Sequence, residues 1–252
     1  MRIRLPYFLL LLTGVALFVC VLQNRALTRA ELRLQSEPNL ACGTSIALEA
    51  AIDKLSLENE PETAQIRKAL VQQSNKSQTC RTETIKALVQ AMDQPNLNFF
   101  TDRRSFILWS NGSAILGELK AVESLDLLIE HLHLNDGAFS ASMAHQPAFR
   151  GVTQMGELAV PKLSIALQQN KSESVRRASV LCLVAIGGST AIKALELTLP
   201  SERNPCVRDL IETAVEILNK ESSLKGQPSN QAEEDKLLDL RRELLVSYRC
   251  RS

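Results

Sequence analysis

The chain has 252 residues, of which 45% are hydrophobic and 23% charged, as expected for a globular protein with a sizeable core. Aromatic residues make up 4%, and because strands favour aromatic and β-branched side chains, this composition favours helices. The formal net charge of +1 provides no strong field to attract nucleic acid, so we expect no nucleic-acid partner.

Residues 1–24 read as a targeting segment. Arg2 and Arg4 precede an uncharged, mostly apolar run over residues 5–22. This run is near the lower length limit of a membrane-spanning helix and longer than the core of an ordinary signal peptide. We expect a single-pass signal anchor that leaves residues 26–252 outside the cytoplasm. A cleaved signal peptide, which would give a secreted or periplasmic protein, is the alternative.

The cysteines fit an exported domain, where disulfides can form. Of the six cysteines, those that follow the apolar run are Cys42, Cys80, Cys182, Cys206 and Cys250. Possible disulfides are Cys42 with Cys80 and Cys206 with Cys250, although spacing alone does not decide the pairing. The absence of C-x-x-C argues against a zinc ribbon and a thioredoxin-type redox pair. Cys182 lies inside an apolar run, and we expect it to be a small buried side chain.

A polar stalk is expected over residues 25–43, followed by N-terminal helical hairpins over residues 44–100. Apolar residues recur there at i, i+3 and i+4, the spacing of one helix face. The predicted helices cover residues 45–55, 62–73 and 83–92, and a break follows at 93–102.

Between residues 101 and 220 a pattern recurs every 30 to 40 residues, which is typical of a stacked repeat array. Each unit has an apolar helix, a glycine, a small residue followed by a β-branched one, and a leucine. The helices span 104–116, 147–155 and 173–186; the glycines are Gly117, Gly156 and Gly187; the leucines are Leu125, Leu163 and Leu195. We expect each glycine to end its helix in a left-handed conformation, so that a second helix runs back antiparallel. One hairpin cannot bury its apolar face alone, so the hairpins must stack.

The stretch SVRRASVLCLVAIGGSTAIKALELTL, residues 174–199, resembles the short HEAT-like repeats of phycobilisome-lyase-type proteins. The matching residues are Val175, Arg176, Ala178, Leu183, Ile186, Gly187, Ala191, Ile192 and Leu195. The resemblance implies an all-α fold: a short α-solenoid of antiparallel helical hairpins with an ARM-type superhelix. It also implies that Arg176, Arg177 and Arg208 pair with acids or carbonyls of neighbouring hairpins. It says little about function, because such arrays serve many roles.

The C-terminal part divides into a linker over residues 221–231 and an amphipathic helix over 232–252. The apolar stripe predicted for this helix consists of Leu237, Leu240, Leu244 and Tyr248. The helix can fold back as a cap on the array, which we favour because terminal repeats need a polar cover. Self-association through residues 232–248 is the alternative.

No catalytic, cofactor-binding or metal site is expected. The histidines are His131, His133 and His145, and their spacing matches no zinc motif. The chain also lacks the nucleophile-elbow, dinucleotide-binding, P-loop and H-E-x-x-H patterns.

An insertion over residues 135–150 is the predicted partner contact, because long loops in repeat proteins often lie on the binding side. Its candidate contact residues are Phe139, Met143, His145 and Phe149. The sequence thus predicts a non-catalytic protein–protein interaction or scaffolding module, membrane-anchored or exported, which binds an unknown protein or peptide through the solenoid surface and this loop. The alternatives are a phycobilin-lyase-like enzyme or chaperone, and a structural subunit of the cell envelope.

Overall fold

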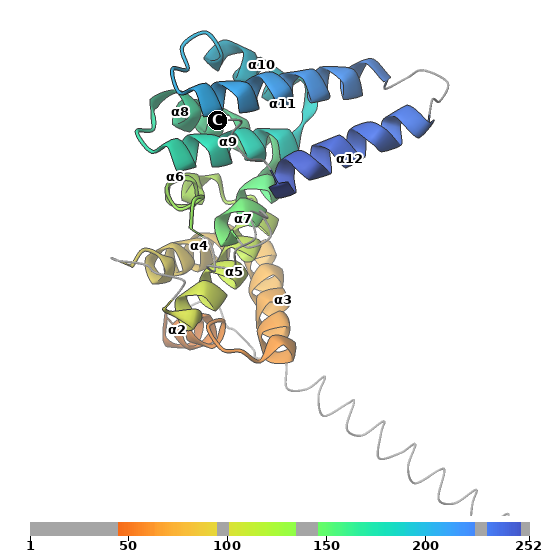
Figure 1. The fold of residues 1–252 in the computed structure, drawn as a ribbon. Helices are drawn as coiled ribbons and strands as arrows, with labels where there is room; N and C mark the ends of the chain where they lie inside the picture. Colours follow the sequence, from red (N-terminus) through yellow and green to blue (C-terminus); the bar gives the residue numbers. More distant parts are fainter. Residues whose placement is uncertain (1–44, 95–100, 135–145, 225–230, 248–252) are drawn as a thin grey trace, which may run out of the picture. The chain divides into compact units, whose positions relative to one another are not determined.

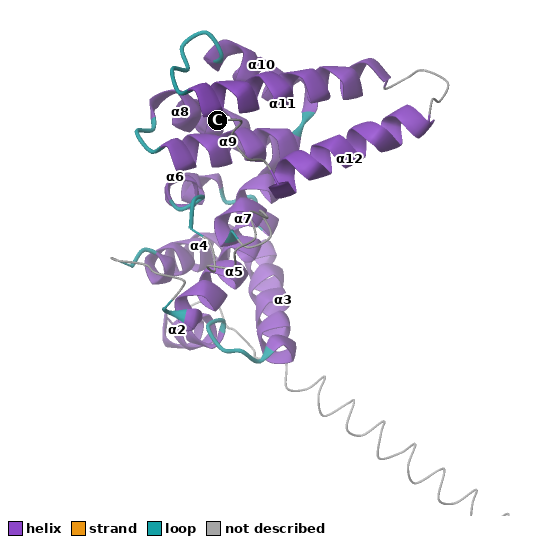
Figure 2. Ribbon diagram, viewed as in Figure 1, coloured by secondary structure: helices purple, strands orange, loops and turns teal. Residues whose placement is uncertain are grey.

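The structure is a computed structural model that describes residues 45–94, 101–134, 146–224 and 231–247 (Figure 1). These residues belong to one compact unit, Leu40–Ser252. Every regular element in the described ranges is a helix (Figure 2), so the all-α prediction is confirmed. Within the same ranges, no helix combines the length and hydrophobicity needed to cross a membrane. The predicted anchor and stalk lie outside the described residues.

The N-terminal helices pack around α5. They are α2 (Ser45–Lys54), α3 (Glu60–Lys76) and α4 (Gln78–Met92), followed by α5 (Arg103–Glu118). Helices α3 and α4 contact each other, and both contact α5. The turn between α3 and α4 is short because Ser77 ends one helix and caps the next, its hydroxyl accepting a hydrogen bond from the Cys80 amide at 3.1 Å.

Two buried polar side chains of α5 bind the ends of earlier helices. Trp109 is fully buried, and its Nε1 donates to the carbonyl oxygen of Met92 at 3.0 Å. Asn111 Nδ2 donates to the carbonyl oxygen of Leu55 at 2.9 Å, and Arg67 Nη1 donates to Asn111 Oδ1 at 3.4 Å. Because carbonyls at a helix C-terminus lack partners within the helix, these bonds fix α5 against α4 and α2.

The helices that follow α5, in the part of the chain where the sequence predicts repeats, form two layers together with α5. These helices are η1 (Val122–Ser124), α6 (Leu125–Glu130), α7 (Pro147–Met155), η3 (Gly156–Ala159), α8 (Val160–Gln169), α9 (Glu173–Ile186), α10 (Gly188–Thr198) and α11 (Pro205–Leu224). Helices α5, α7, α9 and α11 contact one another in succession; we call them the A layer. Helices α6, α8 and α10 do the same beside them and form the B layer (Figure 1).

The element boundaries agree closely with the sequence prediction in the middle of the repeats. Helices α7 and α9 span the predicted residues 147–155 and 173–186. Helix α5 begins one residue earlier and ends two residues later than predicted, at Glu118. Helix α11 continues to Leu224, so its last turn occupies the first residues of the predicted 221–231 linker.

Gly117 does not end its helix, and that prediction was wrong. It lies inside α5, where α5 crosses α7. A Cβ at Gly117 would lie 2.7 Å from the carbonyl oxygen of Gly151, and a Cβ at Gly151 would lie 2.5 Å from that of Ser113. Both glycines are therefore needed because the two backbones touch, and not because either position requires a positive φ.

Gly156 and Gly187 do end their helices. They follow α7 and α9 with φ of 63° and 68°. Their ψ angles of −137° and −164° are extended, so neither is in the left-handed helical region that we predicted. Positive φ with extended ψ is a region that side chains other than glycine rarely enter, so glycine is required more strictly than predicted.

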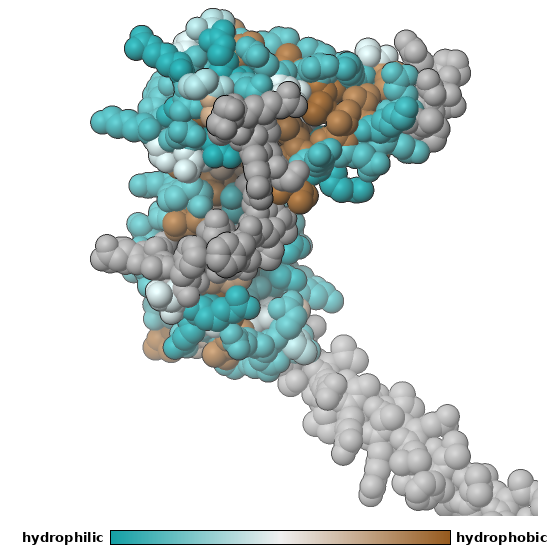
Figure 3. Space-filling model, viewed as in Figure 1, coloured by the Kyte–Doolittle hydropathy of each residue, from teal (hydrophilic) through white to brown (hydrophobic). Residues whose placement is uncertain are grey.

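Helix α12 (Gln231–Ser247) packs on its own chain, against α11 and α9. Leu237 and Leu244 are buried, but Leu240 is 49% exposed, so the predicted stripe is wrong at that residue. Arg241, between the two buried leucines, contacts α9 in its place; Tyr248 lies outside the described residues. Figure 3 shows apolar side chains gathered between α11 and α12.

We predict that Gly151→Ala lowers the free energy of unfolding by about 1–3 kcal/mol, because the added Cβ forces α5 and α7 apart. Urea unfolding followed by circular dichroism measures this loss. Gly112→Ala is the control: its Cβ would meet the Met92 side chain, at 2.5 Å from Sδ, and that side chain can move. A stabilised Gly151→Ala protein, as expected for an uncrowded helix position, would contradict the role given to this contact.

Candidate functional site

The outer face of the B layer carries an apolar side chain at the same place in three repeats. Two residues after each repeat leucine stand Leu127 on α6, Ile165 on α8 and Leu197 on α10. Ile165 is 50% exposed and Leu197 73% exposed, whereas Leu127 is partly buried against the core. Since α6, α8 and α10 contact in succession, these residues form what we call the apolar row. The repeat alignment contained this signal, but sequence reasoning considered only the buried positions.

A groove of about 370 Å³ lies between α6 and α8 and includes one member of the apolar row. It is lined by Asp126, Ile129, Glu130, Lys162, Ile165, Ala166, Gln169 and Asn170. Lys162 Nζ donates to both carboxylate oxygens of Asp126, at 2.7 and 2.8 Å. The groove therefore offers apolar contact beside a neutralised ion pair and the carboxylate of Glu130.

A second cavity, of about 570 Å³, lies among α2, α4 and α5. On its wall, Arg104 Nη2 donates to Asp53 Oδ1 at 3.3 Å and to Ser56 Oγ at 3.2 Å. Hydrogen bonds from the side chain and backbone of Ser105 lower the pKa of Asp102, another lining residue. Asp102 thus caps α5 as an ionised group, which does not suit it to donate a proton in catalysis.

The last residues of the predicted contact segment belong to helix α7. Phe139, Met143 and His145 lie outside the described residues, but Phe149 belongs to α7 and packs, partly buried, against the core. Pro147 in the first turn starts α7 inside the predicted insertion, because proline needs no amide partner there. Phe149 therefore contributes to packing inside the repeat, and not to a loop.

The two described histidines bind backbone carbonyls near the end of α6. His131 Nδ1 lies 2.9 Å from the carbonyl oxygen of Leu127, and its ring centroid is 4.8 Å from that of Trp109. His133 Nδ1 lies 3.1 Å from the carbonyl oxygen of Glu130. In the described part of the chain, no cluster of three or more histidine, cysteine or acidic side chains could hold a metal ion.

The repeat arginines hold the turn between α10 and α11. Arg176 Nε bonds to Glu202 Oε2 at 3.0 Å, and its Nη1 donates to the carbonyl oxygen of Asn170 at 2.9 Å. Arg208 Nη1 donates to the carbonyl oxygen of Glu202 at 3.2 Å. The side chains of Arg176 and Glu202 are only 16% and 5% exposed. This is the structural role that the HEAT resemblance implies, although the sequence did not point to Glu202 as the partner.

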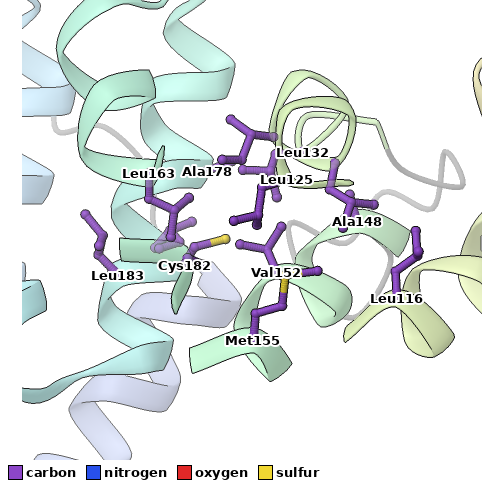
Figure 4. Close-up of a cluster of buried hydrophobic side chains, with 14 of the residues drawn as sticks. Leu116, Leu125, Leu132, Ala148, Val152, Met155, Leu163, Ala178, Cys182 and Leu183 are labelled. Carbon is purple, nitrogen blue, oxygen red and sulfur yellow. The ribbon is translucent and has the colours of Figure 1, made fainter. Parts of the chain in front are cut away.

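The described cysteines include two that form disulfides and one that is free. Cys80 and Cys206 are each disulfide-bonded, while Cys42 and Cys250 lie outside the described residues. Cys182 is free and fully buried in α9, and Figure 4 shows its sulfur directed toward Val152 of α7. Burial raises the pKa of the Cys182 thiol well above its usual value, so the reactive thiolate is suppressed.

No protein-family model matches the sequence, and no curated protein matches it. The described residues themselves are thus the basis for a functional proposal. They present an apolar row that is exposed at Ile165 and Leu197, a groove with carboxylates on its α6 side, and the buried ion pair of Arg176 with Glu202.

We predict that Cys182 in the native protein reacts with a maleimide at least roughly 10³-fold more slowly than in urea, because labelling requires the core to open. Peptide mapping by mass spectrometry measures the modification at this residue. Cys182→Ala should cost about 1 kcal/mol, as a mild change in the core. Native labelling as fast as in urea would instead assign Cys182 to a reactive site.

We predict that Arg176→Ala lowers the free energy of unfolding by about 3–5 kcal/mol, because it leaves the buried Glu202 carboxylate without its cation. Chemical denaturation measures the loss. Lys162→Ala is the matched control, since its ion pair with Asp126 is exposed and should contribute less than about 1 kcal/mol. Equal losses in the two variants would contradict the structural role of Arg176.

Proposed function

We propose that the protein is a non-catalytic protein-binding module, built as a short α-solenoid of antiparallel HEAT-like hairpins. The resemblance of residues 174–199 to such repeats supports this architecture. So does the succession of contacts within the A layer and within the B layer. The glycines that follow α7 and α9 stand at corresponding places in two successive repeats.

We further propose that the module is exported and held at the membrane by residues 5–22. The length and hydrophobicity of that run support an anchor. The disulfide-bonded state of Cys80 and Cys206 supports an oxidising compartment, because thiols stay reduced in most cytosolic proteins.

The apolar row is the observation that carries the binding function. Leu197 is highly exposed and is aligned with Ile165 and Leu127 on neighbouring helices. A partner that covers these side chains removes apolar surface from water, which contributes favourable free energy to binding. The A layer supports the B layer from behind through contacts of α9 with α8 and α10, so the row is presented on a firm surface. In the sequence, the predicted 135–150 loop follows α6, the helix that carries Leu127.

The partner is a protein or peptide that inserts apolar side chains between those of the row. The net charge of +1 gives the chain no general attraction for a polyanion, which disfavours nucleic acid. Ion pairs at the surface of the groove, such as Lys162 with Asp126, would contribute to partner selection more than to affinity.

Site-specific photo-cross-linking in intact cells tests this function. A photoreactive residue at Leu197 or Ile165 should cross-link one protein that mass spectrometry identifies. The same residue at Asn219, exposed on α11 of the A layer, is the control and should not capture that protein. In a chain with the photoreactive residue at Ile165, the substitution Leu197→Glu should remove the cross-link. It should leave the melting temperature unchanged, because Leu197 is exposed. Cross-links of equal yield from all three positions, or none from the row, would refute the proposal.

A further inference from the structure

Helix α12 is held to the rest of the domain by few apolar contacts. Among its residues with described side chains, Leu237 and Leu244 are the buried ones. Leu244 belongs to the contiguous core, and Leu245 packs against that core partly buried. Leu238, Leu240 and Val246 remain 52%, 49% and 46% exposed. An element with so few buried contacts opens more readily than the core helices.

Arg241 anchors α12 to α11 and α9 through polar contacts. Arg241 Nη1 bonds to Glu221 Oε2 of α11 at 2.9 Å. Its Nη2 donates to the carbonyl oxygens of Val184 and Ala185 at 2.5 and 2.9 Å. Helix α9 ends at Ile186, so these carbonyls are among those left without partners within the helix, where a cation is favoured.

The surface beneath Arg241 is shaped for a guanidinium group. A Cβ on Gly187 would lie 3.2 Å from Arg241 Nη2, so the absence of a side chain there makes room for the arginine. The Glu221 side chain is only 14% exposed, and its Oε1 is buried and accepts no hydrogen bond from the described residues. Without Arg241, a buried carboxylate and two helix-end carbonyls would lose their cation, so this surface requires a positively charged occupant.

These contacts define which helix sequence can bind the surface of α9 and α11. It is an amphipathic helix with leucine, arginine and leucine at i, i+4 and i+7, the spacing of Leu237, Arg241 and Leu244 on one helix face. Each copy of this chain carries one such helix and one such surface, so two copies can satisfy each other reciprocally.

We propose that α12 is a reversibly docked strap, and that the face of α9 and α11 which it covers also accepts α12 of a second copy. Two chains then exchange their C-terminal helices and form a dimer. Helix α12 docked on its own chain is the predicted cap, and α12 docked on a second copy is the predicted self-association. Both use the same contact with α9 and α11. This proposal does not depend on the binding function of the B layer, because the apolar row takes no part in it.

A peptide of residues 231–247, labelled with a fluorophore, tests the site on the full chain. The chain carries Arg241→Glu, which places a carboxylate against Glu221 and weakens its own strap. Fluorescence anisotropy should show binding of the wild-type peptide, and at least ~10-fold weaker binding of the peptide with Arg241→Ala. The peptide with Leu240→Ala is the matched control and should bind like wild type, because Leu240 is exposed in the docked helix. Absence of binding, or equal binding of all three peptides, would overturn the proposal.

Exchange between chains is tested by mixing two variants. Chains with Arg241→Glu and chains with Glu221→Arg each lack the cation–carboxylate pair. In a mixture, α12 of the Glu221→Arg chain still carries Arg241 and can dock on the Arg241→Glu chain, which still carries Glu221. Analytical ultracentrifugation should show a dimer in the mixture and monomers in each variant alone. A monomeric mixture, although the peptide binds, would overturn the exchange of helices.

Hydrogen exchange of the unmodified chain is independent of how the variants fold. Amides of α12 should exchange at least ~10-fold faster than those of α9. Equal protection of the two helices would overturn the reversible strap.

Discussion

The close contact of α5 with α7 joins the N-terminal helices α2, α3 and α4 to the helices that follow α7. Helix α5 contacts α3 and α4 on the N-terminal side, and α7 leads on to α9, the helix on which α8, α10, α11 and α12 also pack. Gly117 and Gly151 let the two backbones touch, with Ser113 beside them. A side chain at either glycine would shift the N-terminal helices relative to the repeats, so the position of every later helix depends on this crossing.

A second constraint is that carbonyl groups at helix ends need hydrogen-bond donors, which side chains of other helices supply. Trp109 binds the end of α4, Asn111 the end of α2, and Arg241 the end of α9. Arg176 binds the carbonyl of Asn170, just beyond the end of α8. Each of these residues is a polar side chain in an otherwise apolar or amphipathic helix. Each of them donates to a carbonyl group at or just beyond a helix end, where the helix itself supplies no donor.

The two layers have different surfaces and, in our proposals, different tasks. The B layer presents the apolar row on three neighbouring helices, and the A layer carries α12 across α9 and α11. Because the row and the strap are on separate layers, a partner on one leaves the other accessible. A binding module with a self-association surface of its own is the combination that these features favour.

The helical class and the boundaries of α7 and α9 could be predicted from the amino-acid sequence, because apolar spacing, Pro147 and the glycines after each helix are local signals. The burial of Cys182 could be predicted in the same way, since its neighbours along α9 are apolar. The role of Gly117 could not be predicted in this way, because it depends on the close approach of α7. The same holds for Glu202 as the partner of Arg176, and for Arg241 in place of Leu240 on the packed face of α12. In each case the deciding partner is distant in sequence, and helical periodicity does not specify which distant group a side chain meets.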